Sequence, residues 1–423
     1  MLGVVVLVLL RLGFGFVRLG PHPLDDRPPT ARLGAGGCPG LQVTPARGQV
    51  AWTVRSTAGS TYVPFDPLAV DGGFVVAAGG CIASVDTGGR LRWSIRGSFS
   101  AAAASGGTVV LSGFEGWPRV VALDAATGRR RWTGSEDVRW GALAAGDGSV
   151  LLGGTAIAVR SAAEGRRLDT GRDAGRFPYV LAQGGLLVAG GSSPSGSGAV
   201  VAFDRTGRTV TDAKVDIAVP RPVAVTAEVI VVQSDRGASG AGPPAAASEP
   251  VRLAGIARTT GAVLWTRPLP DLPATAVAAG DVLVVAVGGV PTGIEAASGR
   301  TLWEQPNARD IVAVGDRTVA VATNGGAVQA LDARTGVVRW TTPPIPGRLV
   351  RLVATGEGAV LVATSDDWLR LLRAADGAMV VEGAGPRLAL AASRDLELPP
   401  VAVTGGVWAT RLDDGGVAGV RVG

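Results

Sequence analysis

Short apolar runs alternate with turn residues along most of the chain, and one stretch shows the plan clearly. Between Trp303 and Gly336, three β-rich runs (IVAV, TVAVAT and AVQALD) are separated by the turn signals GD and NGG. A fourth run follows Gly336, where Val338 and Trp340 lie two residues apart and so point to one face of a strand. The 3.6-residue apolar period of a helix is absent. The pattern predicts an all-β protein built from four-stranded units.

The unit recurs, and its most constant feature is a turn glycine followed four residues later by tryptophan. The full form joins the glycines Gly48, Gly89, Gly128, Gly261, Gly299 and Gly336 to the tryptophans Trp52, Trp93, Trp132, Trp265, Trp303 and Trp340. Degenerate copies keep the turn without the tryptophan at Gly165, Gly207, Gly377 and Gly416. The glycines are 37 to 42 residues apart, except for one interval of 54 that holds a Gly-, Pro-, Ala- and Ser-rich insertion at 236–250. A period near forty is typical of propeller blades.

The most complete copies of the repeat are LDAATGRRRW at 123–132 and LDARTGVVRW at 331–340. They resemble the repeats of the PQQ-type β-propellers, a family that includes the quinoprotein alcohol dehydrogenases and the BamB-like propellers. The resemblance covers residues 41–423 and implies a single propeller with four-stranded blades. In that family the repeated tryptophan docks one blade onto the next, which implies a structural role for the six motif tryptophans.

The blade number depends on how the two ends of the chain combine. Nine intervals follow an isolated strand at 49–54, whereas eight blades is the family norm; we expect eight, with nine as the literal count. The last turn, at Gly416, has no motif tryptophan. We therefore expect the strand that carries Trp52 to complete the C-terminal blade.

Charge gives little support to a nucleic-acid partner. The net charge is +5, and Lys214 is the only lysine. The clusters at 129–131 and 166–167 are typical of solvated turns, because a single-strand-binding groove interleaves basic residues with exposed aromatics. Glycine, at 64 of 423 residues, is about twice its usual ~7%, as expected for a fold rich in tight turns.

Histidine is nearly absent, and this bears on catalysis. The one histidine, His22, precedes the first repeat, so no Ser-His-Asp or Cys-His arrangement can form within the repeats. A PQQ-dependent dehydrogenase would, by the resemblance, need an adjacent cysteine pair and Glu, Asn and Asp around calcium. The chain has no Cys-Cys and only two asparagines. We expect no catalytic residues, no cofactor and no metal.

Two cysteines, Cys38 and Cys81, are too far apart for a CxxC motif. One disulfide is favoured if the chain lies outside the cytoplasm; the alternative is two free thiols.

The N-terminus predicts a membrane-associated segment. Residues 2–10 and 12–17 are apolar and are separated by Arg11, which costs about 2.5–3.5 kcal/mol at a helix centre. We interpret residues 1–19 as an anchor or signal-like segment and 20–40 as a Pro- and Gly-rich linker. The propeller, 41–423, is expected at the cell membrane and facing out of the cytoplasm.

These features favour a monomeric, non-enzymatic binding or scaffold module for a protein, peptide or glycan. The first alternative is a BamB-like outer-membrane protein assembly factor, and the second is a PQQ-dependent dehydrogenase. Candidate contact loops lie at 113–119, 190–198 and 236–250. Trp117 falls outside the repeat register and is either a loop contact or packed beneath its loop.

Overall fold

A computed structural model describes most of the repeating region. The described residues are 38, 40–45, 50–57, 65–97, 99–113, 120–136, 138–169, 175–234, 251–270, 276–287, 289–315, 317–347, 349–355, 358–364, 368–384, 402–404, 406–412 and 416–421. They belong to one compact unit, Leu33–Gly423. The predicted anchor at 1–19, and the predicted linker apart from Cys38 and Gly40, lie outside them.

Each repeat forms its own antiparallel sheet, and we number the sheets as blades 1 to 9 in chain order. The strands of blades 1 to 4 are β3 (Leu68–Val70), β4 (Gly73–Ala78), β5 (Cys81–Asp86) and β6 (Leu91–Arg96); β7 (Phe99–Ser105), β8 (Thr108–Gly113), β9 (Val120–Asp124) and β10 (Arg130–Gly134); β11 (Val138–Gly146), β12 (Ser149–Gly154) and β13 (Ala158–Ser161); and β14 (Arg176–Gln183), β15 (Leu186–Ser192), β16 (Gly198–Phe203) and β17 (Thr209–Val215).

Blades 5 to 8 repeat the four-stranded plan, and blade 9 joins the two ends of the chain. Their strands are β18 (Pro220–Val225), β19 (Val229–Ser234), β20 (Val251–Ala257) and β21 (Val263–Leu269); β22 (Ala276–Ala279), β23 (Val282–Val287), β24 (Val290–Glu295) and β25 (Thr301–Glu304); β26 (Ala308–Ala313), β27 (Thr318–Thr323), β28 (Val328–Asp332) and β29 (Val338–Thr341); β30 (Leu349–Thr355), β31 (Ala359–Thr364), β32 (Trp368–Arg373) and β33 (Met379–Ala384); and β34 (Ala402–Thr404), β35 (Val407–Arg411), β36 (Val417–Arg421), β2 (Val50–Ser56) and β1 (Leu41–Pro45).

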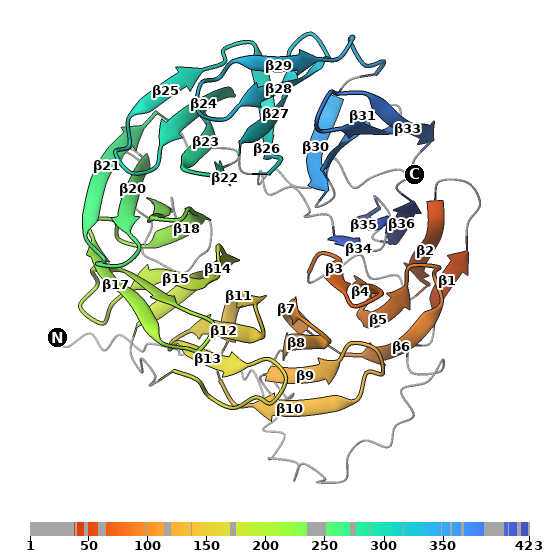
Figure 1. Cartoon of the computed structure of the whole chain (residues 1–423). Helices are drawn as coiled ribbons and strands as arrows, with labels where there is room; N and C mark the ends of the chain where they lie inside the picture. The colour runs from red at the N-terminus through yellow and green to blue at the C-terminus, as the bar shows by residue number, and fades with distance from the viewer. Residues whose placement is uncertain are drawn as a thin grey trace, which may run out of the picture. The chain divides into compact units, whose positions relative to one another are not determined.

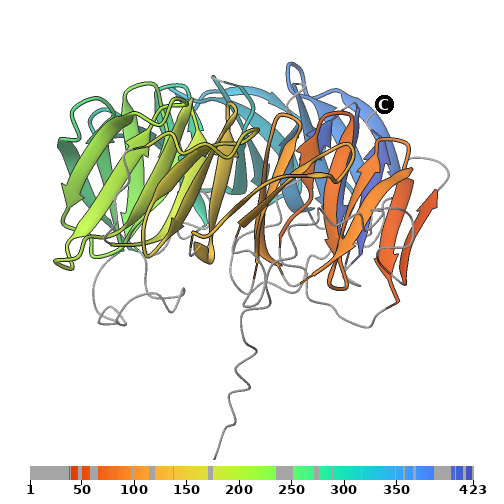
Figure 2. The ribbon, with the colours of Figure 1, turned by 90° about the horizontal axis from the view of Figure 1, so that it is seen from below.

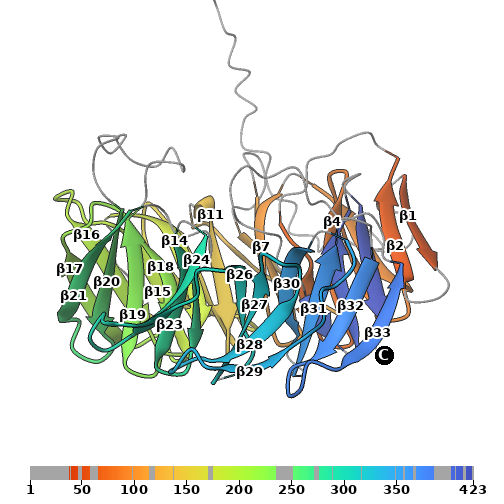
Figure 3. The same cartoon turned by 90° about the horizontal axis from the view of Figure 1, so that it is seen from above.

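Within this unit the blades follow one another around a ring, with the first strand of each blade innermost (Figure 1). Seen from the side, the blades stand next to one another with their strands across the thickness of the ring (Figures 2 and 3). The prediction of one all-β propeller is confirmed. The described residues form nine sheets, the literal repeat count, and not the eight of the family norm.

The blade number is nine because even the irregular intervals form separate sheets. Blade 3 has three strands, and in place of a fourth it has a single bridge between Arg160 and Arg167. Blade 9 has five strands, because two N-terminal strands add to three C-terminal ones.

The core lies between the blades, and the two-residue period of the strands explains why. Along β4, Phe74, Val76 and Ala78 pack toward blade 9, whereas Val75 and Ala77 pack toward blade 2. Both faces of a middle strand are thus buried, and such strands read as continuous apolar runs. Eight clusters of buried side chains among the described residues fill the junctions from blade 9 through blade 1 to blade 8.

Ring closure depends on the N-terminal strands. β2 pairs antiparallel with β36, so Trp52 lies opposite Gly419, and this pairing confirms the expectation that the Trp52 strand completes the last blade. β1 then pairs with the outer edge of β2. Just before β1, Cys38 forms a disulfide with Cys81 of blade 1, with a Cα–Cα distance of 6.1 Å. Blade 9 is therefore linked covalently to its neighbour.

Truncation tests this closure. Deleting residues 1–37 keeps β1, β2 and the disulfide, so the melting temperature is expected to stay close to that of the full chain. Deleting residues 1–57 removes both strands and leaves the edge of β36 unpaired, a condition that favours aggregation. Light scattering after gel filtration, together with calorimetry, checks both variants. Equal melting temperatures and two monodisperse monomers would contradict the closure.

Candidate functional site

The motif tryptophans join neighbouring blades through one hydrogen bond each. Trp93 lies on the outer strand of blade 1, and its Nε1 donates to the carbonyl oxygen of Ala125 in blade 2 at 2.8 Å. The same bond recurs from Trp132 to Ala162, from Trp265 to Ala296, from Trp303 to Ala333 and from Trp340 to Ala374, at 2.7–2.9 Å. Each acceptor lies in the turn between the third and fourth strands of the next blade, or at the equivalent turn of blade 3.

Small residues surround each of these indole rings. A Cβ on the turn glycine Gly128 would lie 2.7 Å from Cγ of Trp93, and Gly128 also has a φ of +69°. Glycine is thus required there both by the left-handed backbone and by the approach of the ring. The residue opposite each motif tryptophan on the adjacent strand is also small. These residues are Gly419, Ser84, Ala122, Gly255, Gly293 and Ala330.

Trp52 is the exception, since its Nε1 is buried without a hydrogen-bond partner. Its ring contacts Gly89, as the motif requires. The turn that carries Gly89 is one residue shorter than most, however: the Gly89 amide bonds to Asp86, three residues back, whereas the Gly128 amide bonds to Asp124, four residues back. The shorter turn lacks the residue whose carbonyl accepts the indole N–H elsewhere.

Two degenerate repeats replace the tryptophan in different ways. Thr211 occupies the position four residues after Gly207, and its hydroxyl donates to the carbonyl oxygen of Arg258 in blade 5. A threonine thus makes the bond that tryptophan makes elsewhere, which the search for Gly-x-x-x-Trp does not detect. At the junction of blades 3 and 4, the backbone and Cβ of Leu168 lie against Gly207.

Gly48 and Trp117 lie outside the described residues. The predicted loops at 113–119 and 236–250 are described only at Gly113, whereas the loop at 190–198 is described and contains three serines whose hydroxyls contact one another: Ser193, Ser195 and Ser197.

Because the strands of a blade alternate in direction, the turns between strands 1 and 2 and between strands 3 and 4 lie on the same side of the ring, which we call the turn face. Two of its aspartates, Asp332 and Asp124, are held by hydrogen bonds from their own blades. Asp332 accepts hydrogen bonds from Arg339 at 2.6 Å and from the hydroxyl of Thr335 at 3.1 Å. The bond from Arg339 is the main reason that the pKa of Asp332 is lowered to about 2, against the opposing effect of burial.

Asp124 repeats this arrangement in blade 2. Burial raises its pKa, but the hydrogen bonds from Arg131 and Thr127 outweigh that effect and lower the pKa to about 2. Carboxylates that stay ionised and fixed in position make the turn face a rigid polar surface.

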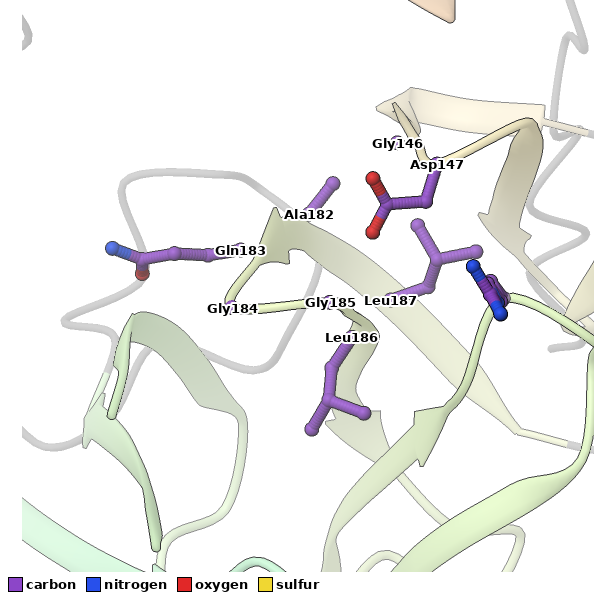
Figure 4. A pocket seen from close by; sticks show the side chains of 9 residues that line it. Gly146, Asp147, Ala182, Gln183, Gly184, Gly185, Leu186 and Leu187 are labelled. Atoms are coloured by element: carbon purple, nitrogen blue, oxygen red, sulfur yellow. The ribbon is translucent and has the colours of Figure 1, made fainter. Parts of the chain in front are cut away.

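The turn face contains a cavity of about 160 Å³ between blades 3 and 4. It is lined by the turn that follows β11, by the turn between β14 and β15, and by one residue of the turn after β16. These residues are Gly146, Asp147, Ala182, Gln183, Gly184, Gly185, Leu186, Leu187 and Arg205. The carboxylate of Asp147 points into this space, whereas the side chain of Gln183 points away from it (Figure 4). Sequence reasoning missed this cavity, because it singled out none of the residues that line it.

The described part of the chain contains no group of three or more His, Cys, Asp or Glu side chains arranged to hold a metal ion. No helix within that part is long and apolar enough to cross a membrane.

Blades docked by tryptophan and closed by an N-terminal strand define the class of protein as a β-propeller of PQQ-type repeats. The family model of the outer membrane protein assembly factor BamB matches residues 41–176, 161–310 and 288–421. The chain therefore belongs to this family, and the resemblance drawn from the sequence is confirmed. No curated protein sequence matches the chain.

Several solved structures of low sequence identity are similar to the chain. BamB from Moraxella catarrhalis is 16% identical, with 90% of this chain and 100% of that chain covered and a TM-score of 0.48. The computationally designed protein Ika8 is 16% identical, with coverage of 77% and 96% and a TM-score of 0.50. A eukaryotic initiation factor is 10% identical, with coverage of 76% and 87% and a TM-score of 0.54. At these identities, the likenesses to Ika8 and to the initiation factor show the fold and nothing more.

Trp93 and Trp52 offer a matched test of the inter-blade hydrogen bond, because both side chains are fully buried. Trp93→Phe removes the bond to Ala125, whose carbonyl keeps a bond from the hydroxyl of Ser84 at 3.0 Å. Trp52→Phe removes no bond. We expect Trp93→Phe to lower the free energy of unfolding by about 1 kcal/mol more than Trp52→Phe. Urea unfolding measures both, and equal losses would show that the bond contributes nothing.

Asp332 makes the stability of the folded protein depend on pH. Its pKa lies near 2 in the folded protein and at 3.8 ordinarily, so its contribution is complete above pH 3.8 and is lost as the pH falls toward 2. Asp332→Asn is expected to be less stable at pH 6 and to approach the wild type in melting temperature near pH 2. Asp216→Asn, at a fully exposed side chain, is the control. A constant difference between Asp332→Asn and wild type over this range would contradict the role of Asp332.

Proposed function

We propose that the chain is a non-enzymatic binding module, held at the membrane by its N-terminal segment and facing out of the cytoplasm as a monomer. Its membership of the BamB family over residues 41–421 is the observation that carries this proposal. Among a protein, a peptide and a glycan, a protein is the partner that the family favours.

The turn face supports binding in preference to chemistry. Several of its carboxylates are held by hydrogen bonds, as Asp332 is by Arg339 of its own blade and Thr335 of its own turn. A surface fixed before binding loses little conformational entropy when a partner docks. The disulfide between Cys38 and Cys81 supports a location outside the cytoplasm, because disulfides persist in oxidising compartments.

A BamB-like role in assembling outer-membrane proteins is the second candidate. The family model favours it, since BamB is described as an outer membrane protein assembly factor. In that case the partner would be another component of an assembly machine.

Site-specific crosslinking tests the proposal. A photoreactive amino acid replaces Glu164, on the turn face with its side chain 69% exposed, or Asp216, on the opposite face and fully exposed. In membranes from the native host, we expect a discrete protein adduct from position 164 and none from position 216. The absence of a discrete adduct at 164, or the same adducts from both positions, would contradict binding at the turn face.

Thiol reactivity in cells of the native host tests the location of the protein. Cysteine alkylation after acid quenching is expected to modify neither Cys38 nor Cys81 until a reductant is added. Two reactive thiols in the untreated cells would contradict a site outside the cytoplasm.

A further inference from the structure

The cavity between blades 3 and 4 has an occupied counterpart between blades 1 and 2. In the counterpart, Asp71 precedes the glycine of a turn in blade 1, and Gly106 and Gly107 form the corresponding turn of blade 2. A Cβ on Gly107 would lie 3.6 Å both from Oδ2 of Asp71 and from Nη2 of Arg131. The guanidinium of Arg131 thus lies over the glycine turn, where it pairs with Asp124 of its own blade at 2.7 Å and donates to the hydroxyl of Thr108 at 2.9 Å; among the described ion pairs, none joins it to Asp71.

Blades 3 and 4 keep the carboxylate and the glycines of this arrangement. Asp147 precedes Gly148 in the turn of blade 3, and Gly184 and Gly185 form the turn of blade 4. A Cβ on Gly185 would lie 3.9 Å from Oδ2 of Asp147, and no arginine atom is among the atoms it would meet.

The missing group is identified by the strand register. Arg131 occupies a bulge, the residue skipped where the pairing of β10 with β9 shifts between Arg130 and Trp132. The pairing of β17 with β16 shifts between Thr209 and Thr211, so the equivalent residue in blade 4 is Val210. A valine is too short to reach the turn, and it has no donor.

Arginine at this bulge is used in the same way elsewhere in the ring. Arg92, in blade 1, donates to the carbonyl oxygens of Asp71 at 3.0 Å and Gly72 at 2.7 Å. Arg339, in blade 7, donates to the hydroxyl of Thr318 at 3.0 Å, next to the corresponding turn.

A backbone hydrogen bond also covers the turn between strands 1 and 2 in most blades, and blade 4 lacks this bond. The backbone N–H after the third strand donates to the turn between strands 1 and 2, as from Ala125 to Gly107 at 2.9 Å. The equivalent bonds are from Ala162 to Gly148, Arg258 to Glu228, Ala296 to Asp281, Ala333 to Arg317 and Ala374 to Gly358. In blade 4 the turn between the third and fourth strands is one residue shorter. Among the described hydrogen bonds, none joins Arg205 to Gly185. The turn stays uncovered, which accounts for the cavity.

We propose that this cavity binds the guanidinium group of an arginine side chain from a partner protein. Asp147 supplies the carboxylate, and the carbonyl groups of the Gly184–Gly185 turn supply the neutral acceptors. The proposal rests on the proposed function in taking the partner to be a protein, and it adds the chemistry by which that protein is recognised.

The cavity suits this group in size and rigidity. A cavity of about 150 Å³ holds a benzene ring, so the 160 Å³ here accommodates a planar guanidinium. Asp147 is held in place, because it has a φ of +49° and the amide of the following Gly148 donates to the hydroxyl of Ser105 at 2.8 Å. Non-glycine residues in the left-handed region are strained, and such residues cluster at ligand sites.

Arg205 also lines the cavity and is the competing cation. No ion pair between Arg205 and Asp147 is present among the described contacts. Removing the side chain of Arg205 therefore separates two possibilities: a site for a cation at Asp147, and a site for an anion at Arg205.

The test uses small probes on the full chain, so it does not depend on the identity of the partner. Nα-acetyl-arginine methylamide is titrated while the amide signals of Gly184 and Gly185 are followed by NMR, and the neutral isostere acetyl-citrulline methylamide serves as the control ligand. We expect saturable shifts with the arginine probe and at least tenfold weaker binding of the citrulline probe. Saturable binding of acetyl-glutamate methylamide in place of the arginine probe would overturn the proposal.

Matched variants locate the site. Asp147→Asn is expected to weaken binding of the arginine probe about tenfold, whereas Glu164→Gln, on the same face, leaves it unchanged. Arg205→Ala is expected to strengthen binding, because it removes a like charge. A loss of binding with Arg205→Ala, or unchanged binding with Asp147→Asn, would refute the arrangement.

Val210→Arg supplies the guanidinium from within the chain. We expect it to raise the melting temperature and abolish binding of the arginine probe, while Val210→Gln, which is polar but neutral and shorter, does neither. If Val210→Arg fails to fold, the titration of Asp147→Asn with the arginine probe still tests the proposed site. Failure of the probe titrations with a positive crosslink at position 164 would remove the arginine site and leave the proposed function intact.

Discussion

The docking of a tryptophan from one blade against a turn of the next is the interaction on which this ring depends. In its complete form it combines four features: a large ring on the outer strand, a small residue opposite it, a turn glycine with positive φ, and a carbonyl that accepts the indole N–H. Trp93, Ser84, Gly128 and Ala125 supply all four at one junction. A buried tryptophan removes about 150–250 Å² from water, so the ring and the hydrogen bond together fix both the distance and the angle between blades.

Closure puts a different demand on the first and last blades. A linear chain must join its ends without leaving a sheet edge exposed. Here β2 completes the C-terminal blade and β1 covers the outer edge of β2. The disulfide between Cys38 and Cys81 then ties this added strand to blade 1. The junction whose tryptophan lacks a hydrogen-bond partner, at Trp52, is thus also the one with a covalent link across it.

The cavity between blades 3 and 4 lies where the chain departs from the regular repeat. Where the turn after the third strand is one residue short, a carbonyl acceptor is lost, and the first turn of the blade loses its cover. Blade 1 compensates with Arg92, which bonds directly to the carbonyl groups of that turn. Blade 4 has Val210 at the same position and no substitute, so a cavity lined by the carboxylate of Asp147 opens on the turn face. The cavity thus results from a shortened turn together with a valine, at the position where blade 1, whose turn is equally short, has an arginine.

The sequence by itself determined the repeat, the strand content and the identity of the docking residues, because each is encoded locally. A turn glycine and alternating apolar residues form a pattern that can be recognised within ten residues, as at Asp332, Gly336 and Trp340. The number of blades, the role of Thr211 and the cavity at Asp147 were decided only by the tertiary structure. Whether blade 3 counts as a blade depends on three strands pairing separately from their neighbours. Thr211 replaces tryptophan only because Arg258, 47 residues away, brings its carbonyl within reach. The cavity combines Asp147 with turns from the next blade, whose approach depends on inter-blade packing and cannot be read from spacing along the chain.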